Sequence, residues 1–86
     1  MNIVFHRNFK QQYKKLRAGE KKKCDERIAF FMQDPKHPVL NNHALGGQYK
    51  NYRSINITGD LRAFYEIAAQ DTTLFIIIDT HSNLYS

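Results

Sequence analysis

Apolar residues follow two different periods along this chain of 86 residues, and the change of period predicts where helices and strands lie. Residues 2–5, NIVF, form a short apolar stretch that predicts a first strand. Further on, Phe9, Tyr13 and Leu16 recur at the spacing of one helical face. Gly19 is the predicted end of this first helix, because glycine commonly follows the last helical turn.

A second helix is predicted over residues 20–33, and Pro35 marks its end because the residue before a proline is disfavoured in helical geometry. The side chains predicted to face inward are Cys24, Ile28, Phe31 and Met32. Two helices joined by a short turn form an αα-hairpin.

The C-terminal part is predicted to form a loop followed by three strands. Residues 35–47 contain two prolines, two asparagines and two glycines, which is typical of a loop. Strands are predicted over 48–57, 61–67 and 73–80, with a glycine turn at 58–60. A strand, two helices and then consecutive strands predict a single α+β domain, in which the helix pair covers one face of an antiparallel sheet.

Alternation within the first of these three strands separates an apolar face from a polar one. Ile55 and Ile57 share the side expected to face the helices, whereas Tyr52, Ser54 and Asn56 share the other. We therefore expect the second face to be open and to offer a shallow binding surface.

Composition narrows the class of protein. The formal net charge is +5, and Cys24 is the single cysteine, which suits a reducing compartment. The longest apolar run is too short to cross a membrane, and the N-terminal residues lack a hydrophobic signal core. We therefore expect a cytoplasmic protein without a membrane partner.

Basic residues crowd the first third of the chain, and four of them form a stripe at helical spacing. The residues of this stripe are Lys10, Lys14, Arg17 and Lys21. The stripe is either a solvated helix surface or a contact for an anionic partner such as nucleic acid.

Two histidines and one aspartate are the strongest candidates for chemistry. If the last strand lies in the middle of the sheet, His81 at its end comes near Asp60 in the turn or His43 in the loop. These histidines either cap turns, bind a metal or exchange protons at a phosphate ester. No metal-binding spacing such as HExxH is present, and no metal or other cofactor is predicted.

Two arginines lie in the strands beside these groups. The planar guanidinium of Arg53 or Arg62 suits a phosphate, and it stays charged at all relevant pH values. The alternative role is a salt bridge to Glu66 or Asp79.

From residue 43 to the end the chain resembles the RelE/ParE superfamily of toxins from type II toxin–antitoxin systems, and within it the YafQ-like branch. The matching motifs are His43-Ala44-Leu45, Lys50-Asn51-Tyr52-Arg53, Gly59-Asp60 and Thr80-His81-Ser82-Asn83-Leu84-Tyr85. The resemblance implies a ribosome-dependent endoribonuclease, in which the 2′-hydroxyl of messenger RNA attacks the adjacent phosphate. It also implies a cognate antitoxin with an acidic tail.

Carried over by position, the resemblance makes His81 the general acid. It makes His43 and Asp60 the candidates for the base and its orienting partner, and Arg62 the group that stabilises phosphate charge. Residues assigned to substrate positioning are Asn56, Tyr85, Arg53 and Lys50. The basic stripe would then bind ribosomal RNA.

One departure from the family pattern bears on the chemistry. The YafQ-like branch often has a histidine where this chain has Asn56, and an amide cannot exchange a proton near neutral pH. Two other readings keep the fold but not this chemistry. One is a ParE-like toxin that inhibits DNA gyrase by binding it, and the other is an inactive basic module that binds RNA or protein.

Overall fold

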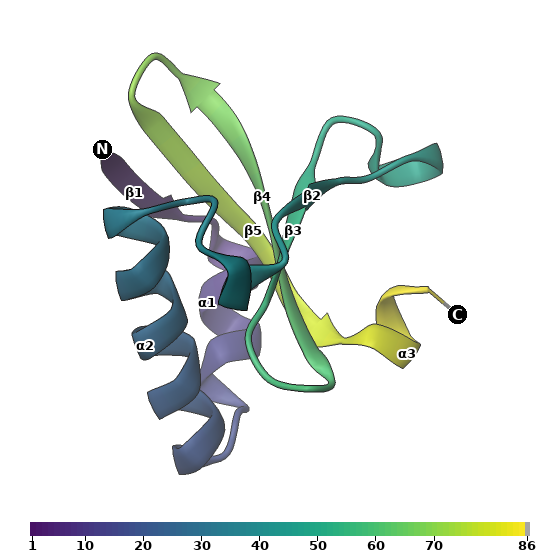
Figure 1. Ribbon diagram of the computed structural model, residues 1–86. Helices are drawn as coiled ribbons and strands as arrows, with labels where there is room; N and C mark the ends of the chain where they lie inside the picture. The colour runs from purple at the N-terminus through teal and green to yellow at the C-terminus, as the bar shows by residue number, and fades with distance from the viewer. Residues whose placement is uncertain (86) are drawn as a thin grey trace.

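The structure of the protein is a computed structural model that describes residues 1–85. Its elements form an α+β fold with one five-stranded sheet (Figure 1). The strands are β1 (Asn2–Phe5), β2 (His43–Ala44), β3 (Arg53–Asn56), β4 (Leu61–Ala69) and β5 (Thr72–Thr80). The helices are α1 (Arg7–Lys14), α2 (Ala18–Gln33) and α3 (His81–Leu84), and short 3₁₀ turns are η1 (Pro38–Leu40) and η2 (Gly47–Tyr49).

The sheet has the strand order β1-β5-β4-β3-β2. β3, β4 and β5 pair antiparallel, as predicted, and β2 adds antiparallel to β3. β1 pairs with β5 in parallel, where an antiparallel sheet was predicted. The sheet is therefore mixed, and the last strand lies inside it between β1 and β4. The α+β prediction, with a first strand, a helix pair and consecutive strands, is confirmed.

The connection between the first two helices differs from the prediction. α1 ends at Lys14, and Gly19 lies inside the first turn of α2 rather than after α1. The reason is local capping: the backbone N–H of Arg17 donates to the Glu20 carboxylate at 2.9 Å, so the new helix begins there. α2 ends at Gln33 before Pro35, as predicted.

The main core lies between the helix pair and one face of the sheet. Ile55 and Ile57 are fully buried on this side, as predicted, and Cys24, Ile28 and Phe31 of α2 pack in the same cluster. The prediction for Met32 is wrong, since that side chain is 52% exposed.

The opposite face of the sheet is less open than its polar sequence predicts. Ser54 and Phe64 on this face are both fully buried. Tyr49 and Tyr85 cover Phe64, with ring centroids at 5.0 Å and 6.1 Å from its ring. The covering residues come from η2 and from the end of the chain, so alternation within the strands alone does not reveal them.

The predicted strand over 48–57 is interrupted at its start. Gly47 has φ of +58°, and the backbone N–H of Tyr49 donates to the Gly46 carbonyl oxygen at 3.1 Å, so residues 47–49 turn instead of extending. The short strand β2, not predicted, pairs with β3 in their place. The predicted turn at 58–60 is present. The Thr58 hydroxyl stabilises it by accepting hydrogen bonds from the N–H groups of Asp60 and Leu61.

Candidate functional site

His81 is the first residue of α3, directly after β5. The Thr80 hydroxyl caps this helix by accepting from the Asn83 N–H at 3.2 Å. The Asp79 carboxylate accepts from the Thr80 N–H at 2.8 Å and from the Asn83 side-chain amide at 3.0 Å. The last residues therefore form a capped helical turn that holds an exposed imidazole at the end of a strand buried in the sheet.

Asp60 lies next to His81, as the sequence suggested. The His81 backbone N–H donates to the Asp60 carbonyl oxygen at 2.8 Å, because Leu61 and Thr80 are register partners of β4 and β5. The Asp60 side chain is exposed and, within residues 1–85, accepts no hydrogen bond. A carboxylate and an imidazole thus extend into solvent from adjacent backbone positions.

Tyr85 packs against His81, with ring centroids 4.6 Å apart and an interplanar angle of 41°. Its own ring is 47% exposed. One side of the imidazole is therefore fixed by an aromatic contact, while Tyr85 keeps surface on which a base could stack.

His43 lies on β2, at the far end of the sheet order from β1. It is exposed, its Nδ1 is 2.8 Å from the Asn41 carbonyl oxygen, and it pairs with Ser54. Since Ser54 pairs with Phe64, His43 shares the side of the sheet that carries Tyr85. Figure 1 shows β2 and α3 together on the side away from α1 and α2.

The structure does not bring His43 into contact with the other two candidates. Three strand spacings of about 4.8 Å each separate β2 from β5. No hydrogen bond or ring contact joins His43 to Asp60 or His81 within the described part of the chain. The three groups therefore share one side of the sheet with a gap between the two imidazoles.

Arg62 binds its own turn. Its guanidinium donates to the carbonyl oxygens of Thr58, Gly59 and Leu61 at 3.0 to 3.3 Å. Neither alternative salt bridge, to Glu66 or to Asp79, forms among residues 1–85. The charge of Arg62 is thus held at the β3–β4 turn, beside Asp60.

Arg53 lies apart from these groups. It pairs with Tyr65, a core residue, so it stands on the opposite side of β3 from His43 and Ser54. Its Nε donates to the Asn42 side-chain oxygen at 2.9 Å, and the Asn42 amide donates to the Tyr65 hydroxyl at 2.7 Å. Asn42 therefore links Arg53 to Tyr65, and its position in a polar loop gave no sign of this role.

Asn56 and Lys50 differ in their surroundings. The Asn56 side-chain oxygen is buried without a hydrogen-bond partner. With Lys23 and Arg27 of α2, Asn56 lines a hollow of about 330 Å³. Lys50 is exposed after η2, at the start of the segment that leads to β3. Neither residue touches His81.

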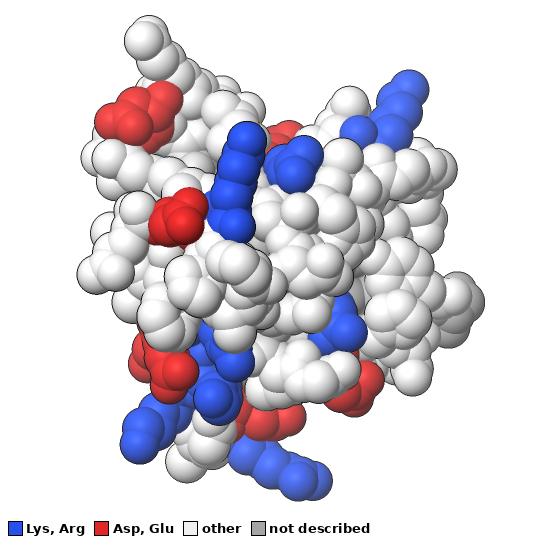
Figure 2. All heavy atoms as spheres, viewed as in Figure 1, with Lys and Arg blue, Asp and Glu red and all other residues white. Residues whose placement is uncertain are grey.

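The basic stripe lies on the helix pair, on the other side of the sheet from His43 and His81. Figure 2 shows Lys and Arg atoms gathered toward the lower end of the helix pair, with acidic atoms among them. Lys21 lies with its Nζ 5.9 Å from the ring centre of Tyr13, in a cation–π contact.

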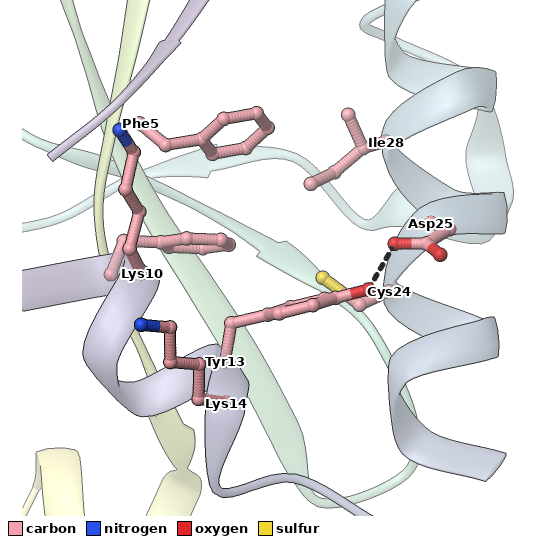
Figure 3. Close-up of a pocket in the computed structure, with 8 residues that line it drawn as sticks. Phe5, Lys10, Tyr13, Lys14, Cys24, Asp25 and Ile28 are labelled. Atoms are coloured by element: carbon pink, nitrogen blue, oxygen red, sulfur yellow. Dashed lines mark hydrogen bonds between the residues drawn. The ribbon is translucent and has the colours of Figure 1, made fainter. Parts of the chain in front are cut away.

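A groove of about 460 Å³ runs between α1 and α2, lined largely by aromatic and aliphatic side chains (Figure 3). Across it the Tyr13 hydroxyl donates to Asp25 at 2.7 Å, and this hydrogen bond raises the pKa of Tyr13 to about 12. Cys24 lies inside the groove, where burial raises the pKa of its thiol to about 12. The thiol is therefore a core group and not a nucleophile.

Residues 1–85 contain no cluster of three or more His, Cys, Asp or Glu side chains that could hold a metal ion. No helix in the same range is long and apolar enough to cross a membrane.

Comparisons with known proteins identify the fold and the family. YafQ from E. coli strain BL21(DE3) superposes with a TM-score of 0.79 at 19% identity, covering 99% of this chain and 98% of that one. The YoeB/ParE toxin from Agrobacterium tumefaciens gives 0.78 at 20% identity over 94% and 99%. The RelB-RelE antitoxin-toxin complex from Methanococcus jannaschii gives 0.74 at 20% identity over 95% and 94%.

No curated protein matches the chain in sequence. The family described as "Bacterial toxin of type II toxin-antitoxin system, YafQ" matches residues 1–86, the whole chain. The chain therefore belongs to the YafQ family of toxins from type II toxin–antitoxin systems.

Proposed function

We propose that this toxin is a ribosome-dependent endoribonuclease that cleaves messenger RNA without a metal or other cofactor. The 2′-hydroxyl attacks the adjacent phosphorus, the bond from phosphorus to the 5′ oxygen breaks, and a 2′,3′-cyclic phosphate and a 5′-hydroxyl form. Water then opens the cyclic ester to a 3′-phosphate. The observation that carries the proposal is that the backbone N–H of His81, whose imidazole is exposed, donates to the backbone carbonyl oxygen of Asp60.

His81 is the general acid and gives a proton to the leaving 5′ oxygen. His43 or Asp60 takes the proton of the 2′-hydroxyl, and the other orients the reacting groups. In an in-line displacement the attacking and leaving oxygens stand on opposite sides of phosphorus. A phosphate bound between α3 and β2 on this side of the sheet would have the acid on one side and His43 on the other, and each must come within hydrogen-bond reach of its oxygen. Each positioned group contributes about 10²–10⁴ in rate.

Charge on the phosphate is stabilised by Arg62, whose guanidinium exchanges carbonyl oxygens of its own turn for phosphate oxygens. Tyr85 stacks on a base beside His81. Lys50 binds a neighbouring phosphate near β2. Arg53 stands on the other side of β3, so it positions substrate indirectly, by holding Asn42 in the loop before β2. Asn56 holds substrate by a hydrogen bond rather than by proton transfer.

The partners follow from the charge distribution. The basic stripe binds ribosomal RNA in the cytoplasm, while messenger RNA occupies the other side of the sheet. The cognate antitoxin carries an acidic tail that covers basic surface and folds on binding. RelB-RelE, an antitoxin-toxin complex of the same fold, supports a protein partner of this kind.

The second candidate function is inhibition of DNA gyrase by binding, without chemistry. The fold shared with a YoeB/ParE toxin favours it as the alternative. A third reading, an inactive basic module, is favoured by Asn56 in place of the family's frequent histidine. Neither alternative requires the side chain of His81.

The test is translation of a defined messenger RNA by purified ribosomes with the wild-type chain or His81→Gln. Primer extension locates cuts, and end analysis identifies the 5′-hydroxyl. The proposal expects cuts by the wild type only with ribosomes present, and loss of cutting by His81→Gln while antitoxin binding persists. Uncut messenger RNA together with inhibited DNA supercoiling by gyrase would establish the alternative, and undiminished cutting by His81→Gln would exclude acid catalysis by that residue.

A further inference from the structure

Tyr49 connects η2 to the C-terminal helix. Its hydroxyl donates to the carbonyl oxygen of Leu84 at 3.3 Å, across 35 positions of sequence. Leu84 is the last residue of α3, and the last carbonyl groups of any helix lack N–H partners within it. Tyr49, which lies in a distant segment, thus supplies a hydrogen-bond donor to the carbonyl group at the end of α3.

Phe64 packs against the Tyr49 ring and so supports this contact. It is fully buried at the centre of the sheet, on the side away from α1 and α2. The Tyr49 ring packs edge-on against it with centroids 5.0 Å apart at 70°, and Tyr85 does so at 6.1 Å and 62°. Edge-to-face packing is the favourable geometry for aromatic pairs. Tyr49 and Tyr85 are therefore both fixed on one rigid strand residue.

The same contacts reach the imidazole. Tyr85 packs on the His81 ring at 4.6 Å, and its N–H donates to the His81 carbonyl oxygen at 3.1 Å. The start of α3 is anchored by Asp79 and Thr80. The end of α3 is anchored by Leu84, which is buried and bound to Tyr49.

We propose that Tyr49 is a positioning residue that holds α3, and with it the His81 imidazole, against the sheet. That Tyr49 holds α3 in place depends only on these contacts. The effect on catalysis rests on the proposed function. A general acid must stay within hydrogen-bond reach of the leaving oxygen, so a looser α3 lowers the fraction of productive geometries. Because Tyr49 acts through α3, its loss lowers kcat and leaves KM unchanged.

The experiment compares Tyr49→Phe with Tyr13→Phe in the full chain. Each variant removes one tyrosine hydroxyl and keeps the ring, and Tyr13 lies across the sheet, bound to Asp25. The first readout is hydrogen exchange of the Asn83 and Tyr85 amides by NMR, which needs no ribosome. Both amides belong to a four-residue helix and its C-cap, and they exchange when α3 opens locally, not when the whole fold opens. Loss of one hydrogen bond therefore predicts about fivefold faster exchange at both amides in Tyr49→Phe, and unchanged exchange in Tyr13→Phe.

The second readout is cleavage of messenger RNA on ribosomes. The proposal expects kcat of Tyr49→Phe to fall about fivefold at unchanged KM, with Tyr13→Phe like the wild type. Exchange and kcat in Tyr49→Phe equal to those in Tyr13→Phe would overturn it. A wild-type chain that leaves messenger RNA uncut would overturn the catalytic consequence with the proposed function, while exchange alone still decides whether Tyr49 holds α3.

Discussion

The backbone N–H of His81 donates to the carbonyl oxygen of Asp60 at 2.8 Å, so the first residue of α3 is fixed to the turn that precedes β4. This bond uses only main-chain atoms. It keeps the backbones of His81 and Asp60 together whatever conformation their side chains adopt, so either side chain can be changed without breaking the bond.

Asp60→Asn should therefore keep the fold and lose activity. The amide has the size of the carboxylate but neither takes a proton nor carries a charge, so we expect messenger-RNA cleavage to fall by about 10²–10⁴. The exposed carboxylate accepts no hydrogen bond within residues 1–85, so the free energy of unfolding should change by less than about 0.5 kcal/mol. Single-turnover cleavage and urea unfolding of the same preparation measure both quantities. Activity within a factor of two of the wild type would remove Asp60 from the chemistry.

The helix pair and the succession of helices and strands along the chain could be predicted from the sequence because their signals are local, whereas the order of the strands in the sheet could not. Phe9 and Tyr13 repeat at helical spacing, and Ile55 and Ile57 alternate toward the core as expected. The predicted helix end at Gly19 was wrong. The Glu20 carboxylate caps the backbone N–H of Arg17, so α2 already begins at Ala18 and includes Gly19. A cap is a single hydrogen bond and leaves no period in the sequence.

The candidate site was less predictable, because its second face is built from distant segments. Phe64 was predicted as part of a strand, but Tyr49 and Tyr85 cover it from opposite ends of the C-terminal half. Nor does spacing reveal that Arg62 binds carbonyl groups instead of Asp79. The motif resemblance includes His81, Thr80 and Tyr85, but it gives no sign of Tyr49 or Phe64, which contact the end of α3 from distant segments.

Tyr13→Phe should destabilise the helix pair. The Tyr13 hydroxyl donates to Asp25 at 2.7 Å between α1 and α2, and we expect loss of about 1 kcal/mol in the free energy of unfolding at pH 7, since the bond is partly exposed. Because the pKa of Tyr13 is raised to about 12 from 10.0, the folded state binds this proton more tightly than the unfolded state. The stabilisation is complete below pH 10 and is lost as pH rises toward 12.

The measurement is urea unfolding of wild type and Tyr13→Phe at pH 7 and across pH 10 to 12. The difference between the two proteins should shrink as pH rises in that range. Tyr52→Phe is the matched control, since the Tyr52 hydroxyl makes no hydrogen bond within the described residues. A difference that stays constant up to pH 12 would show that the Tyr13 proton does not contribute.

Cys24 should resist alkylation in the native protein. Its side chain is fully buried, and burial raises the pKa of the thiol to about 12 from 9.0, so almost no thiolate is present near neutral pH. Iodoacetamide at pH 8 should modify the urea-unfolded chain within minutes and leave the folded chain unmodified over the same period, as measured by mass spectrometry. Equal rates in the two states would mean that the groove between α1 and α2 opens readily.

Charge reversal on the helix pair should weaken ribosome binding without changing the chemistry. Lys10, Lys14 and Arg17 lie on α1 and at the start of α2, on the other side of the sheet from His81. Each phosphate contact contributes about 0.7–0.9 to the slope of log affinity against log salt. Changing all three residues to glutamate should therefore reduce the slope by roughly two to three, while kcat at saturating ribosome stays unchanged.

Lys14→Glu and Lys36→Glu form a matched pair of single reversals for the same measurement, because both change the net charge equally. Lys36 is exposed in the loop after α2, away from the stripe. If association depends on position, Lys14→Glu lowers the slope by close to one, and Lys36→Glu leaves it nearly unchanged. Equal effects of the two would indicate attraction by net charge alone, and binding that salt does not weaken would exclude an electrostatic contact of the helix pair with ribosomal RNA.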